Sequence, residues 1–199
     1  MKTKAIIFDL YNTLLYCSVR KKPYMELFKN LGLTKEEMSF WCDKVMTENY
    51  SSFEDLKLSI KPNSDVYTQN LDYVVKEENE HTHVFDDTYS VLESLHKKYD
   101  LYLLSNIATP YKECFYNLEL DKYFKKVFFS CDIGYRKPQP EAFEMIVKHS
   151  GLQPQQLLMI GDSQHSDYEG ALNVGIKAVL KDKPLSSIPD INRLLTQDF

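Results

Sequence analysis

The chain has 199 residues and a net charge of -5 at pH 7; 43% of its residues are hydrophobic and 27% are charged. This composition is ordinary for a globular protein of one domain, or of one domain with an insertion. The acidic balance provides no broad basic surface, so we expect neither nucleic acid nor an anionic membrane among the partners. Any phosphate must therefore be bound by a few local cations and backbone amides.

The four cysteines, Cys17, Cys42, Cys114 and Cys131, are widely scattered and form no spacing typical of a metal site. We expect them to remain reduced thiols, as in a cytoplasmic protein. The first residues lead into a strand-like segment without the apolar region of a signal peptide, and no apolar run is long enough to span a membrane. The sequence therefore predicts a soluble, cytoplasmic protein and leaves its oligomeric state open.

The first predicted strand is a short apolar run over residues 5–8 that ends on Asp9 and is followed by an Asn-Thr turn. A short apolar run with these boundaries is typical of a buried strand. Asp9 would then lie at the carboxyl end of the strand, where open α/β sheets bind ligands. A carboxylate there can act as a nucleophile or bind a cation, but it can also simply cap a turn. The stretch by itself leaves both interpretations open.

Residues 16–80 lack the pattern of a buried strand and show successive helical patterns instead. Apolar side chains recur at helical spacing in three places. The second of these follows Thr34 and Glu37, which have the spacing of a capping box. We interpret residues 16–80 as a small all-helical cap inserted after the first strand.

From residue 81 onward, predicted strands and helices alternate. Apolar runs predict strands over residues 101–104, 127–129, 157–160 and 176–180. Amphipathic helical patterns separate these runs, and such alternation predicts a parallel sheet covered by helices on both faces. The expected fold class is therefore α/β, with a core made of residues 1–15 and 81–199.

Polar residues follow four of the predicted strands: Asp9, then Ser105 and Asn106, then the loop that leads to Lys137, and finally Asp162 with Asp167. The carboxyl ends of parallel strands share one edge of a sheet, so we expect these residues to converge. Asp9 and Asp162 can share Mg²⁺, which typically binds one or two carboxylates plus water. Ser105 and nearby amides can bind an anion, and Lys137 can neutralise charge that develops on it.

The chain resembles the haloacid dehalogenase-like (HAD) hydrolase superfamily in four motifs, which occur in the family's order. They are Phe8-Asp9-Leu10-Tyr11-Asn12-Thr13-Leu14, Leu104-Ser105-Asn106, Gly134-Tyr135-Arg136-Lys137-Pro138-Gln139-Pro140, and Ile160-Gly161-Asp162-Ser163 through Asp167. The resemblance implies a Rossmann-like core with a helical cap and a covalent intermediate on Asp9. It also implies Mg²⁺ bound by Asp9, Asp162 and the backbone carbonyl of Tyr11, with Asp167 supporting the site. We expect Thr13, Ser105, Asn106 and Lys137 to bind the substrate phosphate.

One position departs from the pattern of the family's phosphatases. Two residues after the nucleophile these enzymes usually carry an aspartate that protonates the leaving alcohol and then activates water, whereas this chain has Tyr11. A phenol with a pKa near ~10 can donate a proton but is seldom available as a base at neutral pH. Several haloacid dehalogenases of the superfamily have tyrosine there, because a halide leaves without a proton. A 2-haloacid dehalogenase is therefore the main alternative.

The other end of the predicted site favours a phosphatase. The dehalogenases carry Ser-Asn-Asp in place of Gly161-Asp162 and work without metal. Their cap also supplies an arginine that captures the halide. Residues 21–80 contain no arginine, so Arg20 could serve only if the linker places it over Asp9. We therefore predict a Mg²⁺-dependent phosphatase of a small phosphorylated metabolite, with Asp9, Tyr11 and Lys137 as catalytic residues. A non-catalytic HAD-fold binding protein is a third interpretation, suggested by Tyr11 and the acidic cap.

Overall fold

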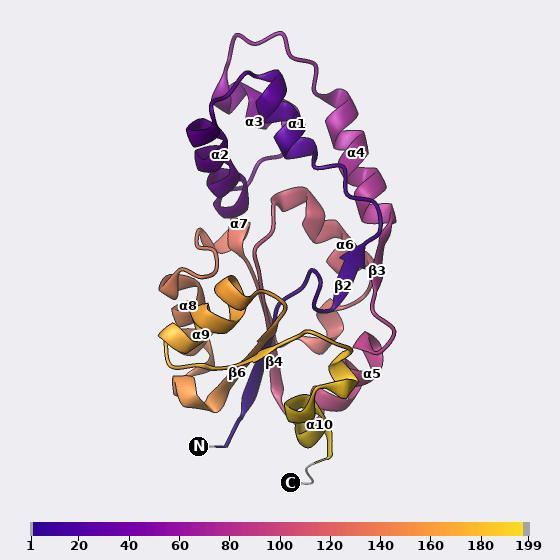
Figure 1. Cartoon of the computed structure of the whole chain (residues 1–199), viewed down its shortest axis with the longest axis vertical. Helices are drawn as coiled ribbons and strands as arrows, with labels where there is room; N and C mark the ends of the chain where they lie inside the picture. The colour runs from indigo at the N-terminus through magenta and orange to yellow at the C-terminus, as the bar shows by residue number, and fades with distance from the viewer. Residues whose placement is uncertain (1, 197–199) are drawn as a thin grey trace.

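A five-stranded parallel sheet forms the centre of the protein in the computed structural model, which describes residues 2–196 (Figure 1). The order of its strands is β5-β4-β1-β6-β7. Their bounds are Ala5–Phe8 for β1, Asp100–Ser105 for β4, Lys126–Phe129 for β5, Leu157–Gly161 for β6 and Lys177–Leu180 for β7. The α/β fold class and the parallel sheet predicted from the sequence are confirmed.

β1 is the middle strand, and its position explains its unbroken apolar sequence. It pairs with β4 on one side and with β6 on the other. Ile6 and Phe8 belong to the apolar cluster on one face of the sheet, and Ala5 and Ile7 to the cluster on the opposite face. Because successive side chains of a strand point to opposite faces, a strand covered on both faces must be apolar at every position.

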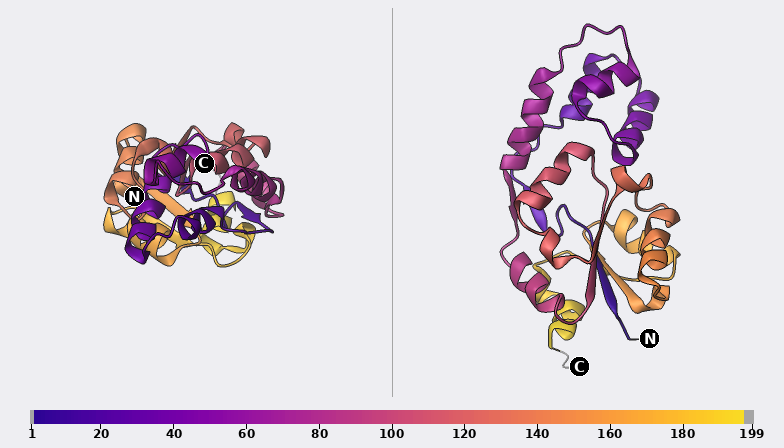
Figure 2. Two further views of the ribbon diagram at one scale, coloured as in Figure 1. Left: turned by 90° about the horizontal axis from the view of Figure 1, so that it is seen from above. Right: turned by 180° about the vertical axis from the view of Figure 1, so that it is seen from behind.

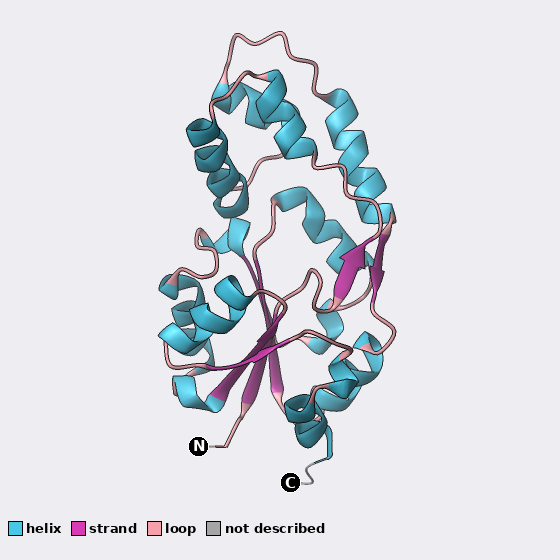
Figure 3. Ribbon diagram, in the orientation of Figure 1, coloured by secondary structure: helices cyan, strands magenta, loops and turns pink. Residues whose placement is uncertain are grey.

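Helices cover both faces of the sheet (Figure 3). One face packs against α5 (Thr88–Leu95), α6 (Lys112–Asn117) and α10 (Pro189–Thr196), and the other against α8 (Pro140–Ser150) and α9 (Gly170–Asn173). Short helical segments complete the core: η1 (Thr109–Tyr111), η2 (Asp121–Tyr123), α7 (Ser130–Ile133), η3 (Pro154–Gln156), the π-helical turn η4 (Gln164–Glu169) and η5 (Leu185–Ser187). None of the helices in residues 2–196 has both the length and the apolar character needed to cross a membrane.

Four helices lie over the carboxyl ends of the strands and form a separate apolar cluster (Figures 1 and 2). They are α1 (Pro23–Asn30), α2 (Lys35–Thr47), α3 (Phe53–Ile60) and α4 (Gln69–Glu80). The predicted capping box is present at the start of α2, where the Glu37 amide donates to Thr34 Oγ1 (3.2 Å) and the Thr34 amide to the Glu37 carboxylate (2.7 Å). We refer to these helices as the cap; the division of the chain at residues 16 and 80 remains an interpretation.

A short antiparallel hairpin connects the cap to the core. Its strands are β2 (Leu15–Cys17) and β3 (Thr82–Val84), which flank the cap in the sequence. The expectation that residues 16–80 contain no strand therefore misses the end of β2. Between β6 and β7, residues 164–169 form η4 and α9 begins at Gly170.

Candidate active site

The structure brings the predicted polar residues together at the carboxyl ends of the strands. Asp9 follows β1, Ser105 ends β4, and Asp162 follows β6, while Lys137 arrives from the loop between α7 and α8. One carboxylate oxygen from each of Asp9, Asp162 and Asp167 lies within 4.8 Å of the other two. The expected convergence of distant residues is thus present in the fold, whereas the role of each side chain remains a prediction.

Lys137 is the buried cation of this site. Its Nζ lies 2.6 Å from Asp9 Oδ1 and 2.6 Å from Asp167 Oδ1, and its side chain is 2% exposed. Burial alone would lower the pKa of Lys137, but the two carboxylates raise it above its ordinary value. Lys137 therefore remains an ammonium at neutral pH and can oppose negative charge that develops beside Asp9.

Asp9 is held rigidly at the end of β1. Its amide donates to the carbonyl of Ile160 (2.9 Å), and its Oδ2 accepts a hydrogen bond from Thr13 Oγ1 (3.1 Å). Burial raises the pKa of the Asp9 carboxyl to about 6, with Asp167 adding to the effect and Lys137 opposing it. An ionised carboxylate in this position is costly to the fold, so a bound cation would stabilise it.

Asp167 is already engaged at both oxygens. Oδ1 faces Lys137, and Oδ2 accepts from the amide of Ser163 (3.0 Å). A Cβ on Gly161 would lie 2.3 Å from the Asp167 carboxyl carbon, so glycine at this position is what allows the aspartate to approach β6. Asp9 and Asp167 both pair with Lys137, and together with the half-buried Asp162 they form a carboxylate cluster that could hold a metal ion.

Asn106 holds the backbone of Lys137. Its Nδ2 donates to the carbonyl of Lys137 (2.8 Å), and its Oδ1 accepts from the amide of the same residue (2.8 Å). One N–H of the Asn106 amide group is left for an anion. The hydroxyl proton of Thr13 points to Asp9, and Ser105 is buried at the end of β4. Phosphate contacts by these three residues stay predictions.

Tyr11 is fixed by aromatic and sulfur contacts. Its hydroxyl lies 3.2 Å from Cys114 Sγ, and its ring packs edge-to-face on Tyr111 with 6.4 Å between centroids. Burial raises the pKa of the Tyr11 phenol above its ordinary value. The phenol is therefore even less available as a base than tyrosine in water.

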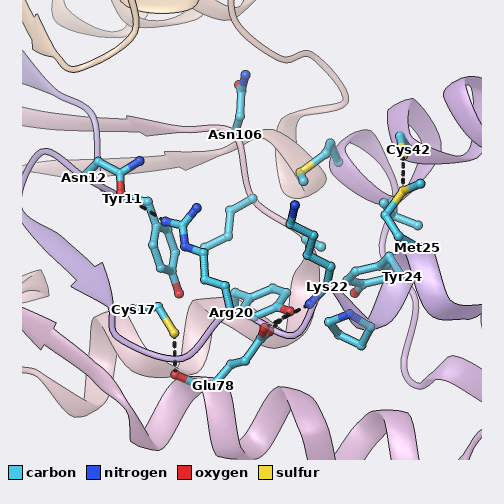
Figure 4. Close-up of a pocket in the computed structure, with 16 residues that line it drawn as sticks. Tyr11, Asn12, Cys17, Arg20, Lys22, Tyr24, Met25, Cys42, Glu78 and Asn106 are labelled. Carbon is cyan, nitrogen blue, oxygen red and sulfur yellow. Dashed lines mark hydrogen bonds between the residues drawn. The ribbon is translucent and has the colours of Figure 1, made fainter.

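A cavity of about 360 Å³ lies between the cap and the loop of residues 9–14, which holds the predicted nucleophile Asp9 and is called the nucleophile loop below. Tyr11 and Asn12 line its core side together with Asn106, and Arg20 and Glu78 reach it from the cap side (Figure 4). The sequence analysis did not identify Glu78 as part of a site. A signal for it exists, because Glu78 follows Leu71 and Val75 at helical spacing and therefore shares the buried face of α4.

Arg20 lies directly beside the nucleophile loop. Its Nη2 donates to Asn12 Oδ1 (3.1 Å), and its guanidinium carbon lies 5.9 Å from the centroid of the Tyr11 ring. The sequence left open whether the segment between β2 and α1 places this arginine over Asp9; the structure places it beside Asn12 and Tyr11.

Known proteins resemble this chain over most of its length. A family described as haloacid dehalogenase-like hydrolase matches residues 3–175. A glyceraldehyde 3-phosphate phosphatase from Methanothermobacter thermautotrophicus is 26% identical over 204 residues, which cover 92% of this chain and 87% of the relative. The enzyme of the same name from Pyrococcus furiosus is 42% identical over 62 residues, 31% of this chain and 26% of the relative.

Solved structures share the fold. A HAD family enzyme from Bacteroides thetaiotaomicron, in complex with magnesium and inorganic phosphate, has a TM-score of 0.67 at 21% identity and covers 92% of this chain and 98% of its own. A 2-haloacid dehalogenase from Pseudomonas syringae pv. Tomato DC3000 has a TM-score of 0.62 at 18% identity, and the match covers 94% of this chain and 92% of the dehalogenase chain. At these low sequence identities the two structures show only that this chain shares their fold. That fold occurs in both proteins, so it does not distinguish one activity from the other. With the family match spanning most of its length, the chain belongs to the haloacid dehalogenase-like hydrolases.

Proposed function

We propose that the protein is a Mg²⁺-dependent phosphatase that hydrolyses small phosphate monoesters through an aspartyl-phosphate on Asp9. The observation that carries the proposal is the convergence of three carboxylates within 4.8 Å around the buried ammonium of Lys137. The relative from Methanothermobacter thermautotrophicus, which the chain covers almost completely, is itself named as a phosphatase.

In this proposal a carboxylate oxygen of Asp9 attacks phosphorus while the ester P–O bond breaks and the leaving oxygen takes a proton. Water then attacks the phosphorus of the acyl phosphate, which releases inorganic phosphate and restores Asp9. Lys137 opposes the charge on the phosphoryl oxygens in both steps. Bound Mg²⁺, held by Asp9 and Asp162, would neutralise part of the same charge and orient the phosphate. The backbone carbonyl of Tyr11 is the third protein ligand in this proposal.

Tyr11 sets the expected substrate reactivity. Its raised pKa makes it a weak acid and a worse base, so departure of an alkoxide gains little help from it. We therefore expect slow turnover with a preference for leaving groups that need little protonation, such as phenolates.

The runner-up function is 2-haloacid dehalogenation, and two observations favour it. Tyr11 stands where the family's phosphatases carry aspartate, and Arg20 lies over its ring beside the nucleophile loop. The three-carboxylate cluster with Asp162 argues against it, because halide departure requires no divalent cation. The two functions therefore differ in metal dependence.

The decisive experiment measures phosphate release from 4-nitrophenyl phosphate and halide release from 2-chloropropionate, each with Mg²⁺ and with excess EDTA. We expect phosphate release that requires Mg²⁺, falls at least about 10²-fold in Asp162→Ala and is abolished in Asp9→Asn. Asp65→Asn, an exposed cap residue, is the control and should match the wild type. Halide release that is unaffected by EDTA would instead establish the dehalogenase.

A further inference from the structure

The cavity beside the nucleophile loop has the position of a leaving-group site. Tyr11 and Asn12, which follow Asp9 closely in the chain, line it together with Asn106, so the cavity adjoins the site and has room for the organic part of a phosphate ester. Much of the lining is apolar or aromatic, including Tyr24 and Tyr111. Such walls suit the body of a small organic group.

Two cations enter the same cavity. Figure 4 shows the Arg20 guanidinium and the Lys22 ammonium pointing to the same side of it. Within residues 2–196 neither side chain forms an ion pair with a carboxylate, and the guanidinium is held by the neutral Asn12 amide (3.1 Å) and the Tyr11 ring. Most N–H groups of Arg20 thus remain free to bind a ligand, and its planar fork suits a carboxylate.

The carboxylate in the cavity does not cancel these cations through direct contact. Glu78 is 4% exposed and already satisfied, since its Oε2 accepts from the hydroxyl of Tyr111 and its Oε1 from the backbone amides of Lys21 (2.5 Å) and Lys22 (3.3 Å). Through these contacts Glu78 holds the segment between β2 and α1, which carries Arg20 and Lys22. The cavity therefore has aromatic walls and two exposed cations at its rim, of which Arg20 is held in place by Asn12 and Tyr11.

We propose that the leaving group of the substrate carries a carboxylate, which Arg20 binds with support from Lys22 while the body of the group packs on the tyrosines. The substrate class is thus a phosphate monoester of a small hydroxy acid. This inference rests on the proposed phosphatase function. It makes Arg20 a specificity-determining residue.

A matched pair of substrates tests the charge requirement: 4-carboxyphenyl phosphate and the neutral analogue 4-carbamoylphenyl phosphate. We expect the wild type to favour the carboxylate in kcat/KM by about tenfold or more, and Arg20→Gln to remove most of that preference. Lys21→Gln is the control, because the Lys21 ammonium pairs with Glu77 (2.7 Å) and does not line the cavity. It should keep the wild-type preference.

A second measurement separates this inference from the phosphatase proposal. Isothermal titration of the metal-free protein with 4-hydroxybenzoate and with 4-hydroxybenzamide reports recognition of the leaving group without any turnover. Tighter binding of the carboxylate that is lost in Arg20→Gln supports the inference even if neither ester is hydrolysed. Turnover of both esters with no preference, or an equal loss on both in Arg20→Gln, overturns the inference and leaves the phosphatase standing.

Discussion

Charge balance around Asp9 explains why this site suits a divalent cation. Three carboxylates, Asp9, Asp162 and Asp167, lie close together, and the buried ammonium of Lys137 pairs with two of them, so negative charge exceeds positive charge inside the cluster. Lys137 satisfies one oxygen each of Asp9 and Asp167, and Lys181 opposes part of the charge of Asp162. A bound cation would neutralise this excess negative charge and so stabilise the buried carboxylates. The same imbalance makes the metal-free site costly to the fold.

That cost should depend on pH in a definite direction. The pKa of Asp9 is raised from 3.8 to about 6 in the folded state, so between these values the native protein holds more protons than the unfolded chain. Its stability therefore falls as pH rises from about 4 to 6. Asp9→Asn, which stays neutral, should gain about 1–3 kcal/mol in the free energy of unfolding relative to the wild type over this range.

Urea denaturation in EDTA at several pH values measures this difference. The gain of Asp9→Asn should level off above pH 7, and saturating Mg²⁺ should reverse it by stabilising the wild type. Asp65→Asn, which is exposed, should follow the wild type at every pH. A difference that stays constant from pH 4 to 7 would show that the Asp9 carboxyl ionises normally in the fold.

Tyr11 offers a test of the acid and base steps. Tyr11→Asp should raise kcat/KM for alkyl phosphates more than for aryl phosphates, because only alkoxides need a proton to leave; a positioned acid contributes about 10²–10⁴-fold. The substitution also removes ring contacts with Tyr111 and Arg20, so part of the gain will be lost to looser packing. Tyr11→Phe keeps the ring and is the control. A large loss on alkyl substrates in Tyr11→Phe would mean that the phenol does donate the proton.

At the scale of elements, the parts predicted from the sequence are those with a strong local signal. The unbroken apolar run of β1 reflects burial on both faces, and the Thr34–Glu37 capping box marks the start of α2. The convergence of strand ends follows from parallel topology, which alternating strands and helices impose. Each of these features depends on sequence neighbours or on a general rule of the fold.

The parts that escaped prediction depend on partners distant in the sequence. β2 and β3 have three residues each, which is too short to show the alternation of apolar and polar residues that marks a strand. Each strand forms by pairing with the other, although the whole cap separates them in the sequence. Glu78 lies in an acidic run, yet it is buried because Tyr111 and the linker amides bind it. The position of Arg20 likewise follows from the hairpin that directs its segment toward the nucleophile loop.

At the scale of the whole molecule, polar contacts join the cap to the core around the site. Asn49 Nδ2 donates to the carbonyl of Cys131 (2.9 Å), and Thr109 Oγ1 donates to Asn49 Oδ1 (2.8 Å). An ion pair between Asp43 of α2 and Arg136 joins the cap to the residue that precedes Lys137. These polar contacts lie close to the loop that carries Lys137, and apolar contacts of Ala108 and Tyr111 with the cap cluster add to them.

The Asp43–Arg136 pair gives the last prediction. Both side chains are well exposed, so the pair should bias closure only modestly. Asp43→Asn should raise KM by no more than about fivefold at low ionic strength, and the difference should vanish at high salt, where screening weakens the pair in the wild type as well. Glu48→Gln, which breaks an ion pair to Lys44 within the cap, is the matched control and should leave KM unchanged. An equal, salt-independent rise in both variants would mean that helix stability, rather than contact with Arg136, controls the effect.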